Sequence, residues 1–389
     1  MKKALIITDE YFPTNRSMLS EFFNKEMTND GLELTWIFRT KTKQFNNKKV
    51  FWNGSPAFLY YYEPSLKNLF VQLFFSVKII FNLLSQRTYD SIIGIDKVNP
   101  AFLSTFFSKL FGKKMIFVSN GPVIEFHKYD VNKSNGLIWF LKKARLFFTE
   151  ITFNLAFSQS SIIHPISNHM KNEFISKKFH HKCFPISERA SEIFLKDYSQ
   201  SKIPNSLVYH GTLGRLRKLE FLLESCSVLK NEGTDFKFFV IGWEETKGDI
   251  SFLKNKAFEL NISNEVIFLG PYPFNFLPFF LSKMEIGLSA IPPEKLFIIS
   301  TPTKVIEYIS LGLPVVCNSE ILVQNEIVTK SNAGYSVKYD VNKFSRSIQK
   351  LLNDSKLRKE KGIQGKNWIT KNWTFKALAS EIKKLYKVQ

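Results

Sequence analysis

Cysteines, long apolar runs and metal-binding patterns are all scarce in this sequence of 389 residues. The three cysteines, Cys183, Cys226 and Cys317, lie too far apart for a Cys-x-x-Cys or Cys/His pattern, which excludes a disulfide framework and a structural zinc site. No segment reaches 18 uninterrupted apolar residues, and the apolar start at residues 4–7 is too short for a signal peptide. We therefore expect a cytoplasmic protein without a membrane-spanning segment.

Acidic residues are also in short supply relative to basic ones. The 54 Lys+Arg residues outnumber the 34 Asp+Glu residues and give a formal net charge of +20. This excess permits a nucleic-acid-binding protein, but the charge is spread over both halves and no nucleic-acid-binding motif is present, so we expect no nucleic-acid partner. Hydrophobic residues make up 44% of the chain, which indicates a globular protein, and the length allows two or three domains.

Short β-rich apolar runs alternate with helical patterns along the whole chain. The first series of runs covers residues 4–8, 34–38, 91–95, 115–119 and 162–166, and the second covers residues 206–209, 236–242, 265–269, 286–289 and 314–316. Such alternation predicts an α/β protein with two doubly wound, Rossmann-like domains of parallel strands. An irregular stretch at residues 183–205 suits a linker, so we expect domains at residues 1–195 and 196–365. Residues 366–389 are expected to form a closing segment whose helix packs back toward the first domain.

The segment at residues 300–316 has the pattern of a loop, a short helix, a tight stop and a strand. Thr301 is expected to be the N-cap and Pro302 the first helical residue, while Gly312 is placed to be a left-handed C-cap. The free N–H groups at this helix start favour binding of an anion.

Polar side chains at the start of this helix strengthen that expectation. The Ser300 and Thr303 hydroxyls and the Lys304 amine suit a diphosphate, and Glu307 is placed to accept two hydroxyl hydrogen bonds from a ribose. The alternative is an ordinary capped helix with a surface glutamate.

A second segment, at residues 209–223, predicts a strand, a glycine-bearing loop with basic residues and a helix. Gly211 permits close approach of the backbone to a ligand, and Arg217 is able to form paired, charge-assisted bonds with phosphate oxygens. Considered alone, a basic helix start is more typical of a solvated face.

Together these segments resemble the donor site of family 4-type glycosyltransferases of the GT-B fold. Residues 302–308 and 312–316 are similar to the family's donor-site helix, in which two glutamates separated by seven residues bracket the region. The second glutamate, which holds the nucleotide ribose, matches Glu307, whereas the first falls on Ile299, a departure for which the nearby Glu294-Lys295 pair is a candidate to compensate.

The resemblance extends to the phosphate and base contacts. Arg217 matches the family's phosphate-binding lysine, Thr212 matches the usual arginine, and Lys218 or Arg215 is a candidate for the second positive charge. Donor-site candidates that follow from the resemblance, together with the residues above, are Gly211, Gly242 and Tyr272.

The amino-terminal half resembles the family only in outline. Thr14, Asn15 and Arg16 occupy the place of the family's glycine-rich loop, and we interpret them as acceptor-binding candidates. Where many relatives carry a histidine that contacts the donor sugar, this chain has Asn120, followed by Glu125 and His127, which are the candidates nearest to catalysis. A structural or solvated role is the alternative for His127.

The resemblance implies a retaining glycosyltransferase with two domains facing each other across a crevice. It implies a nucleotide-sugar donor, a glycan or polyprenyl-diphosphate-linked glycan acceptor, and synthesis of a capsule or O-antigen type of polysaccharide. No cofactor is implied, and no metal is expected because no Asp-x-Asp motif is present. Alternatives are a GT-B-fold nucleotide-sugar epimerase, or a noncatalytic protein that binds a nucleotide sugar or a polyanion.

Two basic regions suit peripheral contact with an anionic membrane surface, at the inner face of the cytoplasmic membrane. The first is a loop with Arg39, Lys41, Lys43, Lys48 and Lys49. In the second, basic and aromatic residues mix: Lys142, Lys143, Arg145, Trp139, Phe140, Phe147 and Phe148. The apolar helix expected at residues 66–84 either is buried on two sides, which we favour, or docks on the bilayer.

Overall fold

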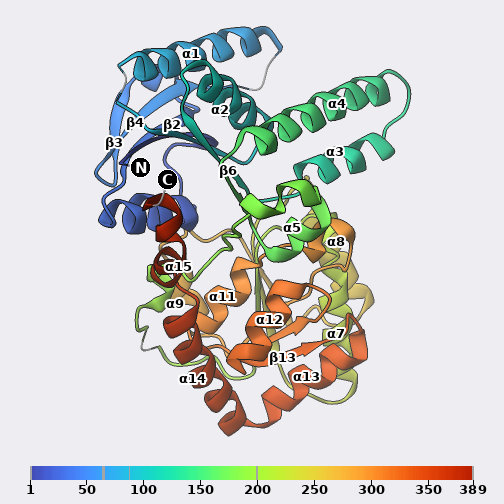
Figure 1. Ribbon diagram of the computed structural model, residues 1–389. Helices are drawn as coiled ribbons and strands as arrows, with labels where there is room; N and C mark the ends of the chain where they lie inside the picture. The colour runs from blue at the N-terminus through green and yellow to red at the C-terminus, as the bar shows by residue number, and fades with distance from the viewer. Residues whose placement is uncertain (1, 64–65, 87, 199, 388–389) are drawn as a thin grey trace. The chain divides into compact units, whose positions relative to one another are not determined.

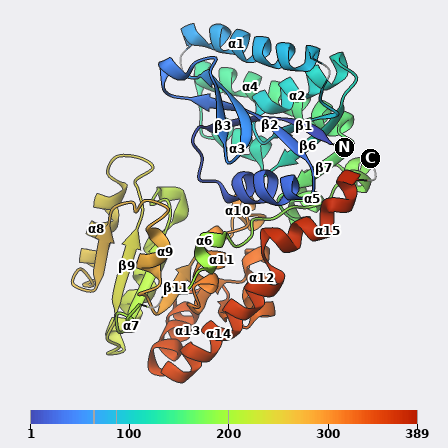
Figure 2. The same ribbon diagram turned by 90° about the vertical axis from the view of Figure 1, so that its left-hand side faces the viewer.

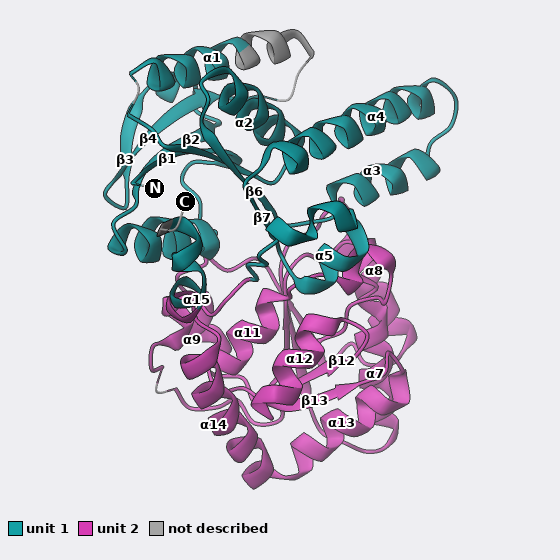
Figure 3. Cartoon of the chain, viewed as in Figure 1, with its two compact units in different colours: residues 1–187, 378–389 teal, residues 188–377 magenta. Residues whose placement is uncertain are grey.

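The computed structural model describes residues 2–63, 66–86, 88–198 and 200–387, with the side chains of residues 66–73 and 387 left out. The chain forms two compact units, coloured separately in Figure 3. Unit 1 comprises Met1–Ser187 and Leu378–Gln389, and unit 2 comprises Glu188–Ala377. This division falls before residue 195, the boundary expected from the sequence.

Unit 1 is built on a twisted sheet with strand order β3-β4-β2-β1-β5-β6-β7 (Figure 1). Strand β3 runs antiparallel to β4, and the other neighbouring pairs are parallel. The strands are β1 (Lys3–Tyr11), β2 (Glu33–Thr40), β3 (Lys49–Trp52), β4 (Ser55–Tyr61), β5 (Ser91–Ile95), β6 (Lys114–Ser119) and β7 (Ile162–Pro165).

Helices cover this sheet because their apolar residues recur at helical spacing. Long helices α1, α2 and α4 lie along one side of the sheet, as Figures 1 and 2 show, and their inner residues join the strand cores. The helices are η1 (Met18–Met27), η2 (Lys43–Phe45), α1 (Leu66–Ser85), α2 (Val98–Leu110), α3 (Val123–Asn132), α4 (Gly136–Gln159), α5 (Asn168–Phe174) and η3 (Lys177–Lys182).

Unit 2 contains a parallel sheet with strand order β10-β9-β8-β11-β12-β13. Its strands are β8 (Ser206–His210), β9 (Lys237–Ile241), β10 (Val266–Leu269), β11 (Ile286–Ser289), β12 (Val315–Asn318) and β13 (Gly334–Val337). Its helices are α6 (Glu192–Leu195), η4 (Arg215–Arg217), α7 (Glu220–Asn231), α8 (Asp249–Glu259), α9 (Leu277–Leu281), α10 (Lys295–Ile298), α11 (Thr303–Ser310), α12 (Leu322–Ser331), α13 (Val341–Asn353) and α14 (Ser355–Asn372). Helix α15 (Phe375–Lys387) begins in unit 2 and ends in unit 1.

The predicted doubly wound α/β class is confirmed in both units. The ten predicted strands are present with ends shifted by a few residues, whereas β3, β4 and β13 were not predicted. One cap prediction is wrong: α11 begins at Thr303, so Pro302 rather than Thr301 is the capping residue, and no side chain caps this helix. Gly312 does adopt the expected left-handed conformation, with φ of +75°.

Arg39 corrects the expectation of a basic membrane-facing loop. Its side chain is buried, and its Nη2 lies 2.6 Å from Oδ1 of Asp9. Burial raises the pKa of Asp9 to about 6, and the Arg39 guanidinium opposes this rise. Arg39 therefore neutralises a core carboxylate and is not available to lipid headgroups.

Helix α1 keeps one face on the sheet and the other in solvent. Ile80 and Leu84 are buried, whereas Phe74 and Phe81 are exposed, so the described half of this helix is not buried on two sides as favoured above. The side chains of its first half lie outside the described residues. Within the described chain, no helix combines the length and the apolar character needed to cross a bilayer.

A buried histidine ties the last helix to unit 1. His164, on β7, donates through Nδ1 to the Phe184 carbonyl oxygen at 2.6 Å, and its Nε2 accepts from the Tyr386 hydroxyl of α15 at 2.9 Å. Burial lowers the pKa of His164 to about 4, well below its ordinary 6.5. The imidazole is therefore neutral in the folded chain at neutral pH.

This histidine makes stability depend on pH. Because the unfolded chain binds a proton below pH 6.5 and the folded chain only near pH 4, His164 destabilises the fold as pH falls through this window, by about 2 kcal/mol between pH 7 and pH 5. We expect thermal unfolding curves to show this loss, and His164→Gln to reduce its slope with pH. The exposed His181 provides the control: His181→Gln should leave the slope unchanged.

Candidate functional site

The sheet of unit 2 changes direction between β8 and β11. From β8 the order runs outward to β9 and β10 on one side, and from β11 to β12 and β13 on the other. In open parallel sheets, ligands bind beyond the carboxyl ends of the strands at such a switch point. The strands end there at His210 and Ser289, which makes this edge the place to examine.

Helix α11 lies against the end of β8 and brings Glu307 to His210. The Nε2 atom of His210 lies 2.8 Å from Oε2 of Glu307, with both side chains largely buried. This approach is not aligned as a hydrogen bond, so among the described residues both atoms lack a hydrogen-bond partner. A buried donor and acceptor left in this state are polar sites that a ligand hydroxyl can satisfy after a small side-chain rotation.

Two glycines bring the loops after β8 and β9 into direct backbone contact. Gly211 has φ of +138° and Gly242 has φ of +158°, and the Gly211 amide donates to the Ile241 carbonyl at 2.9 Å. A Cβ atom on Gly242 would collide with the Gly211 carbonyl oxygen. Both positions therefore favour glycine, and the absence of a side chain at Gly211 lets the Lys304 amine approach its backbone.

The amine of Lys304 lies beside Gly211, and the charge of Arg217 acts on it. The Lys304 Nζ lies 4.1 Å from the centre of the Tyr209 ring and 3.4 Å from the point where a Gly211 Cβ would stand. Desolvation, followed by the Arg217 charge, lowers the pKa of Lys304 to about 7, and Glu307 opposes this shift. Within the described chain, the Arg217 guanidinium forms no ion pair with a carboxylate. Two converging cations without a matching acid favour a bound anion such as a diphosphate.

The other basic candidates of this loop already have acidic partners. The Lys218 Nζ lies 2.7 Å from Oε1 of Glu294. Arg215 Nε donates to Asp249 Oδ1 at 3.0 Å, and its guanidinium stacks 3.4 Å from the Phe252 ring centre. Glu294, the candidate to compensate for Ile299, is thus paired with Lys218 in this structure. The predicted role of Lys218 in donor binding would require that pair to open.

The hydroxyls before α11 differ in availability. Ser300 Oγ donates to the Phe297 carbonyl at 2.6 Å, whereas Thr303 is exposed at the first helical position. Thr301, assigned only to a cap by sequence reasoning, is buried and its Oγ1 has no hydrogen-bond partner among the described residues. Thr301 is thus a donor-site candidate in place of Ser300.

The remaining predicted donor residues lie at the edges of this region. The Thr212 carbonyl accepts a hydrogen bond from the Tyr209 hydroxyl at 3.1 Å, which fixes the loop after β8. Tyr272 lies in the loop after β10 with its ring 4.8 Å from that of Phe280. Trp243, directly after Gly242, is 54% exposed and was not predicted, although an aromatic residue beside a loop glycine was a readable signal.

A buried polar network supports the end of β11. The Ser289 hydroxyl donates to Oε1 of Gln324 at 3.0 Å, and Nε2 of Gln324 donates to the Asn318 carbonyl at 2.7 Å. Oδ1 of Asn318 accepts the Ile291 amide at 2.9 Å. These side chains escaped prediction because their partners are distant in sequence, and they rigidify the loop that leads to α10.

The sheet of unit 1 has a comparable cluster at the carboxyl ends of β1, β5 and β6. Arg16 Nη1 lies 2.9 Å from both Glu10 Oε1 and Asp96 Oδ2. The other oxygen of Asp96, Oδ1, accepts a hydrogen bond from the backbone amide of Asn120 at 2.6 Å. The side-chain oxygen and nitrogen of Asn120 are buried without hydrogen-bond partners among the described residues. Asn120 and Arg16 are therefore brought together through Asp96, a residue that sequence reasoning missed.

The other residues proposed for unit 1 have plainer surroundings. Thr14 Oγ1 accepts the Arg16 amide at 3.2 Å, and Asn15 is exposed. Glu125 pairs with Lys128 at 2.9 Å. His127 is buried between α3 and α4, with its Nδ1 3.0 Å from the Thr149 hydroxyl. Burial, followed by the charge of Arg145, lowers the pKa of His127, which fits the structural alternative for this residue.

Comparison with known proteins gives matches over the whole chain. Residues 192–368 match the family model described as glycosyl transferases group 1. An uncharacterized glycosyltransferase of Methanocaldococcus jannaschii is 25% identical, over 94% of this chain and 92% of the relative.

Two solved structures show the same fold over the full chain. Sucrose-phosphate synthase from Thermosynechococcus elongatus superposes with a TM-score of 0.75 at 13% identity, covering 100% of this chain and 98% of that chain. HepE from Anabaena, in complex with UDP and glucose, superposes with a TM-score of 0.74 at 12% identity and covers 100% of both chains. The predicted GT-B fold is confirmed by these similarities.

The contact between the two glycine loops predicts a steric effect. Gly242→Ala would push the added methyl group into the Gly211 carbonyl oxygen, and we expect it to lower the free energy of unfolding by about 2 kcal/mol. The matched control is Gly270→Ala, because a Cβ at Gly270 meets no atom within 4 Å. Thermal unfolding of both variants decides the matter: equal midpoints would contradict the close approach.

Proposed function

We propose that this chain is a group 1 glycosyltransferase, which transfers a sugar from a nucleotide-sugar donor, and that unit 2 binds that donor at the carboxyl edge of β8. The observation that carries this proposal is the placement of the Lys304 amine against Gly211, with Arg217 close enough for its charge to lower the pKa of Lys304. Two cations without a neutralising carboxylate match the two negative phosphates of a nucleoside diphosphate.

Glu307 is the proposed partner of the ribose. Its carboxylate lies beside His210, lacks an aligned hydrogen bond among the described residues, and is on the same helix as Lys304. A carboxylate in this position is able to accept hydrogen bonds from both hydroxyls of a ribose. The aromatic residues Trp243 and Tyr272, in the loops after β9 and β10, are the proposed neighbours of the base.

The proposed chemistry is transfer with retained configuration and without a metal ion. The bond from the anomeric carbon to the diphosphate oxygen breaks, and a bond to the acceptor oxygen forms on the same face of the sugar. The acceptor proton passes to the departing diphosphate oxygen. Lys304, Arg217 and the amide groups at the start of α11 stabilise the charge that develops on the leaving group.

The proposed acceptor is a glycan or a polyprenyl-diphosphate-linked glycan, in synthesis of a polysaccharide at the inner face of the cytoplasmic membrane. The cluster of Arg16, Asp96 and Asn120 supports an acceptor site in unit 1, because carboxylate, guanidinium and amide groups are typical partners of sugar hydroxyls. The unsatisfied Asn120 amide provides both a donor and an acceptor at this place.

Calorimetric titration tests the donor site directly. We expect the chain to bind one of UDP, GDP, ADP, CMP and dTDP selectively, with UDP first in order because HepE is known with UDP. Arg217→Ala and Glu307→Ala should each weaken binding by about tenfold or more, since each removes a charged contact worth about 1.5–3 kcal/mol.

Matched controls separate the site from general charge effects. Arg346→Ala and Glu232→Ala remove exposed residues of the same types, and both should bind like the wild type. Binding that survives Arg217→Ala and Glu307→Ala would refute the proposed site. Binding without sugar transfer to any glycan would indicate a noncatalytic protein, and release of an altered nucleotide sugar without acceptor would indicate an epimerase.

The lowered pKa of Lys304 predicts uptake of a proton on binding. In the free protein this amine is mostly neutral at pH 8, because burial and Arg217 lower its pKa to about 7, and a diphosphate beside it favours the charged form. Affinity should therefore be constant just below pH 7 and fall as pH rises above it. Calorimetry at pH 8 in buffers of different ionisation enthalpy measures the uptake; an enthalpy independent of buffer would contradict this role.

A further inference from the structure

The helices on one side of the unit 1 sheet have two apolar faces each. The inner faces pack on the strands through residues such as Leu84 of α1, Phe107 of α2 and Phe153 of α4. The outer faces carry large apolar side chains in solvent. An exposed apolar surface of this extent is unusual for a monomer and indicates an interaction site.

Helix α4 presents the longest exposed stripe. Its outward apolar residues fall on one face of the helix, opposite the buried Phe153 and Phe157. They are Leu137, Phe140, Leu141, Phe147, Phe148, Ile151 and Leu155. Phe147 and Phe148, near the middle of the helix, are 59% and 66% exposed.

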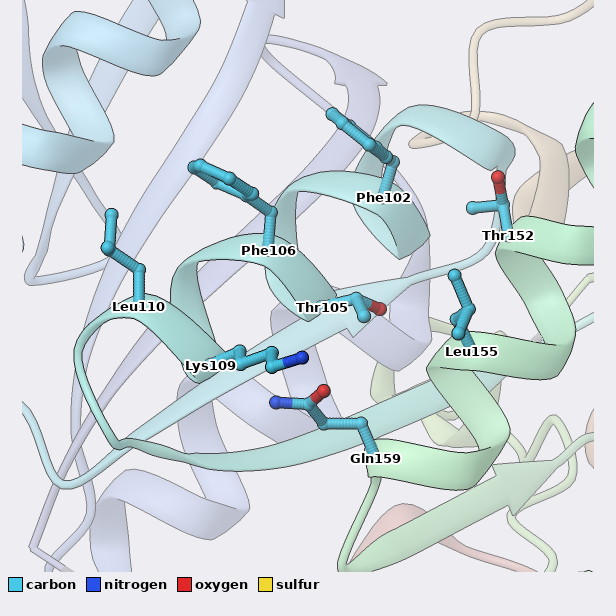
Figure 4. Close-up of a pocket in the computed structure, with 8 residues that line it drawn as sticks. All are labelled: Phe102, Thr105, Phe106, Lys109, Leu110, Thr152, Leu155 and Gln159. Atoms are coloured by element: carbon cyan, nitrogen blue, oxygen red, sulfur yellow. The ribbon is translucent and has the colours of Figure 1, made fainter.

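Helix α2 continues this surface across a groove. Phe102, Phe106 and Leu110 follow one another at four-residue spacing and are exposed. With Thr105 and Lys109 of α2 and with Thr152, Leu155 and Gln159 of α4, they line an open groove of about 440 Å³; Figure 4 shows these residues on the two helices. We call the outward apolar residues of α2 and α4 the aromatic face.

Basic residues outnumber acidic ones on the two helices of the aromatic face. Helix α2 contains no acidic residue, and α4 contains one, Glu150, whose carboxylate lies 3.7 Å from the Lys128 amine. Positive side chains flank the aromatic face at Lys109, Lys143 and Arg145, all of them exposed. Arranged in this way, basic residues beside aromatic ones complement an anionic lipid surface.

We propose that the aromatic face docks this protein on an anionic bilayer, with the rings of α4 in the interface and a lipid chain in the groove between α2 and α4. The one-sided positive charge favours this occupant over a second copy of the chain, whose identical face would carry the same repelling cations. The inference is independent of the donor site, because its residues lie on unit 1 and the proposed diphosphate site lies on unit 2.

Vesicle flotation with the full chain tests the proposal. We expect binding to phosphatidylcholine vesicles that contain phosphatidylglycerol, and much weaker binding to phosphatidylcholine alone. Phe147→Ser with Phe148→Ser should reduce partitioning by about tenfold or more, because two rings no longer enter the interface. Lys143→Gln should reduce it by about fivefold on anionic vesicles only.

A matched control removes exposed apolar area elsewhere. Phe258, on α8 in unit 2, is 76% exposed, so Phe258→Ser loses a comparable ring outside the aromatic face and should bind vesicles like the wild type. Retained nucleotide binding and circular dichroism would show that the α4 double variant is folded. A folded double variant that binds anionic vesicles normally would overturn the proposal, as would a wild type that ignores them. Self-association of the wild type, lost in the same variant, would assign the aromatic face to a second copy instead.

Discussion

The position of Tyr308 determines the geometry of the donor edge. Its hydroxyl accepts the His210 amide at 3.0 Å, and its ring occupies the space where any side chain at position 287 would stand. One residue thus fastens α11 to both strands of the switch point, β8 and β11. Lys304 lies one helical turn before Tyr308, and Glu307 directly precedes it. The position of this buried ring therefore determines where both side chains of the proposed donor site lie.

The two sheets use the same topology to gather polar groups, although their residues differ. In unit 2 the carboxyl edge collects cations around glycine backbone, whereas in unit 1 it collects Arg16, Glu10 and Asp96 in a compensated cluster. The carboxyl edge of the unit 2 sheet therefore favours a negatively charged ligand. The edge of the unit 1 sheet has its charges paired and leaves the side-chain amide of Asn120 and the hydroxyl of Ser119 unsatisfied among the described residues, which suits neutral hydroxyl groups better than phosphate.

Sequence patterns predicted the sheets well because buried strands are recognisable from their apolar residues. They missed β3, which carries exposed residues, and β13, which is short and half-buried, and they also missed β4, although its Ala57 and Leu59 are buried. Within the site, patterns identified the segments but not which cation is available: Lys218 and Lys304 look alike in sequence, yet Glu294 pairs with the first only. Such pairings depend on residues many positions away, and the burial of Arg39 against Asp9 was hidden for the same reason.

The two units are not completed in the order in which their synthesis begins. Unit 2 has adjacent ends, since the Ala190 amide donates to the Trp373 carbonyl at 3.0 Å, and it is therefore a self-contained insertion within unit 1. A ribosome completes unit 2, which ends at Ala377, before most of α15 emerges. Unit 1 has to wait, because Tyr386, which satisfies the buried imidazole of His164, follows the whole of unit 2 in the chain. The domain that begins first is thus the one that is finished last.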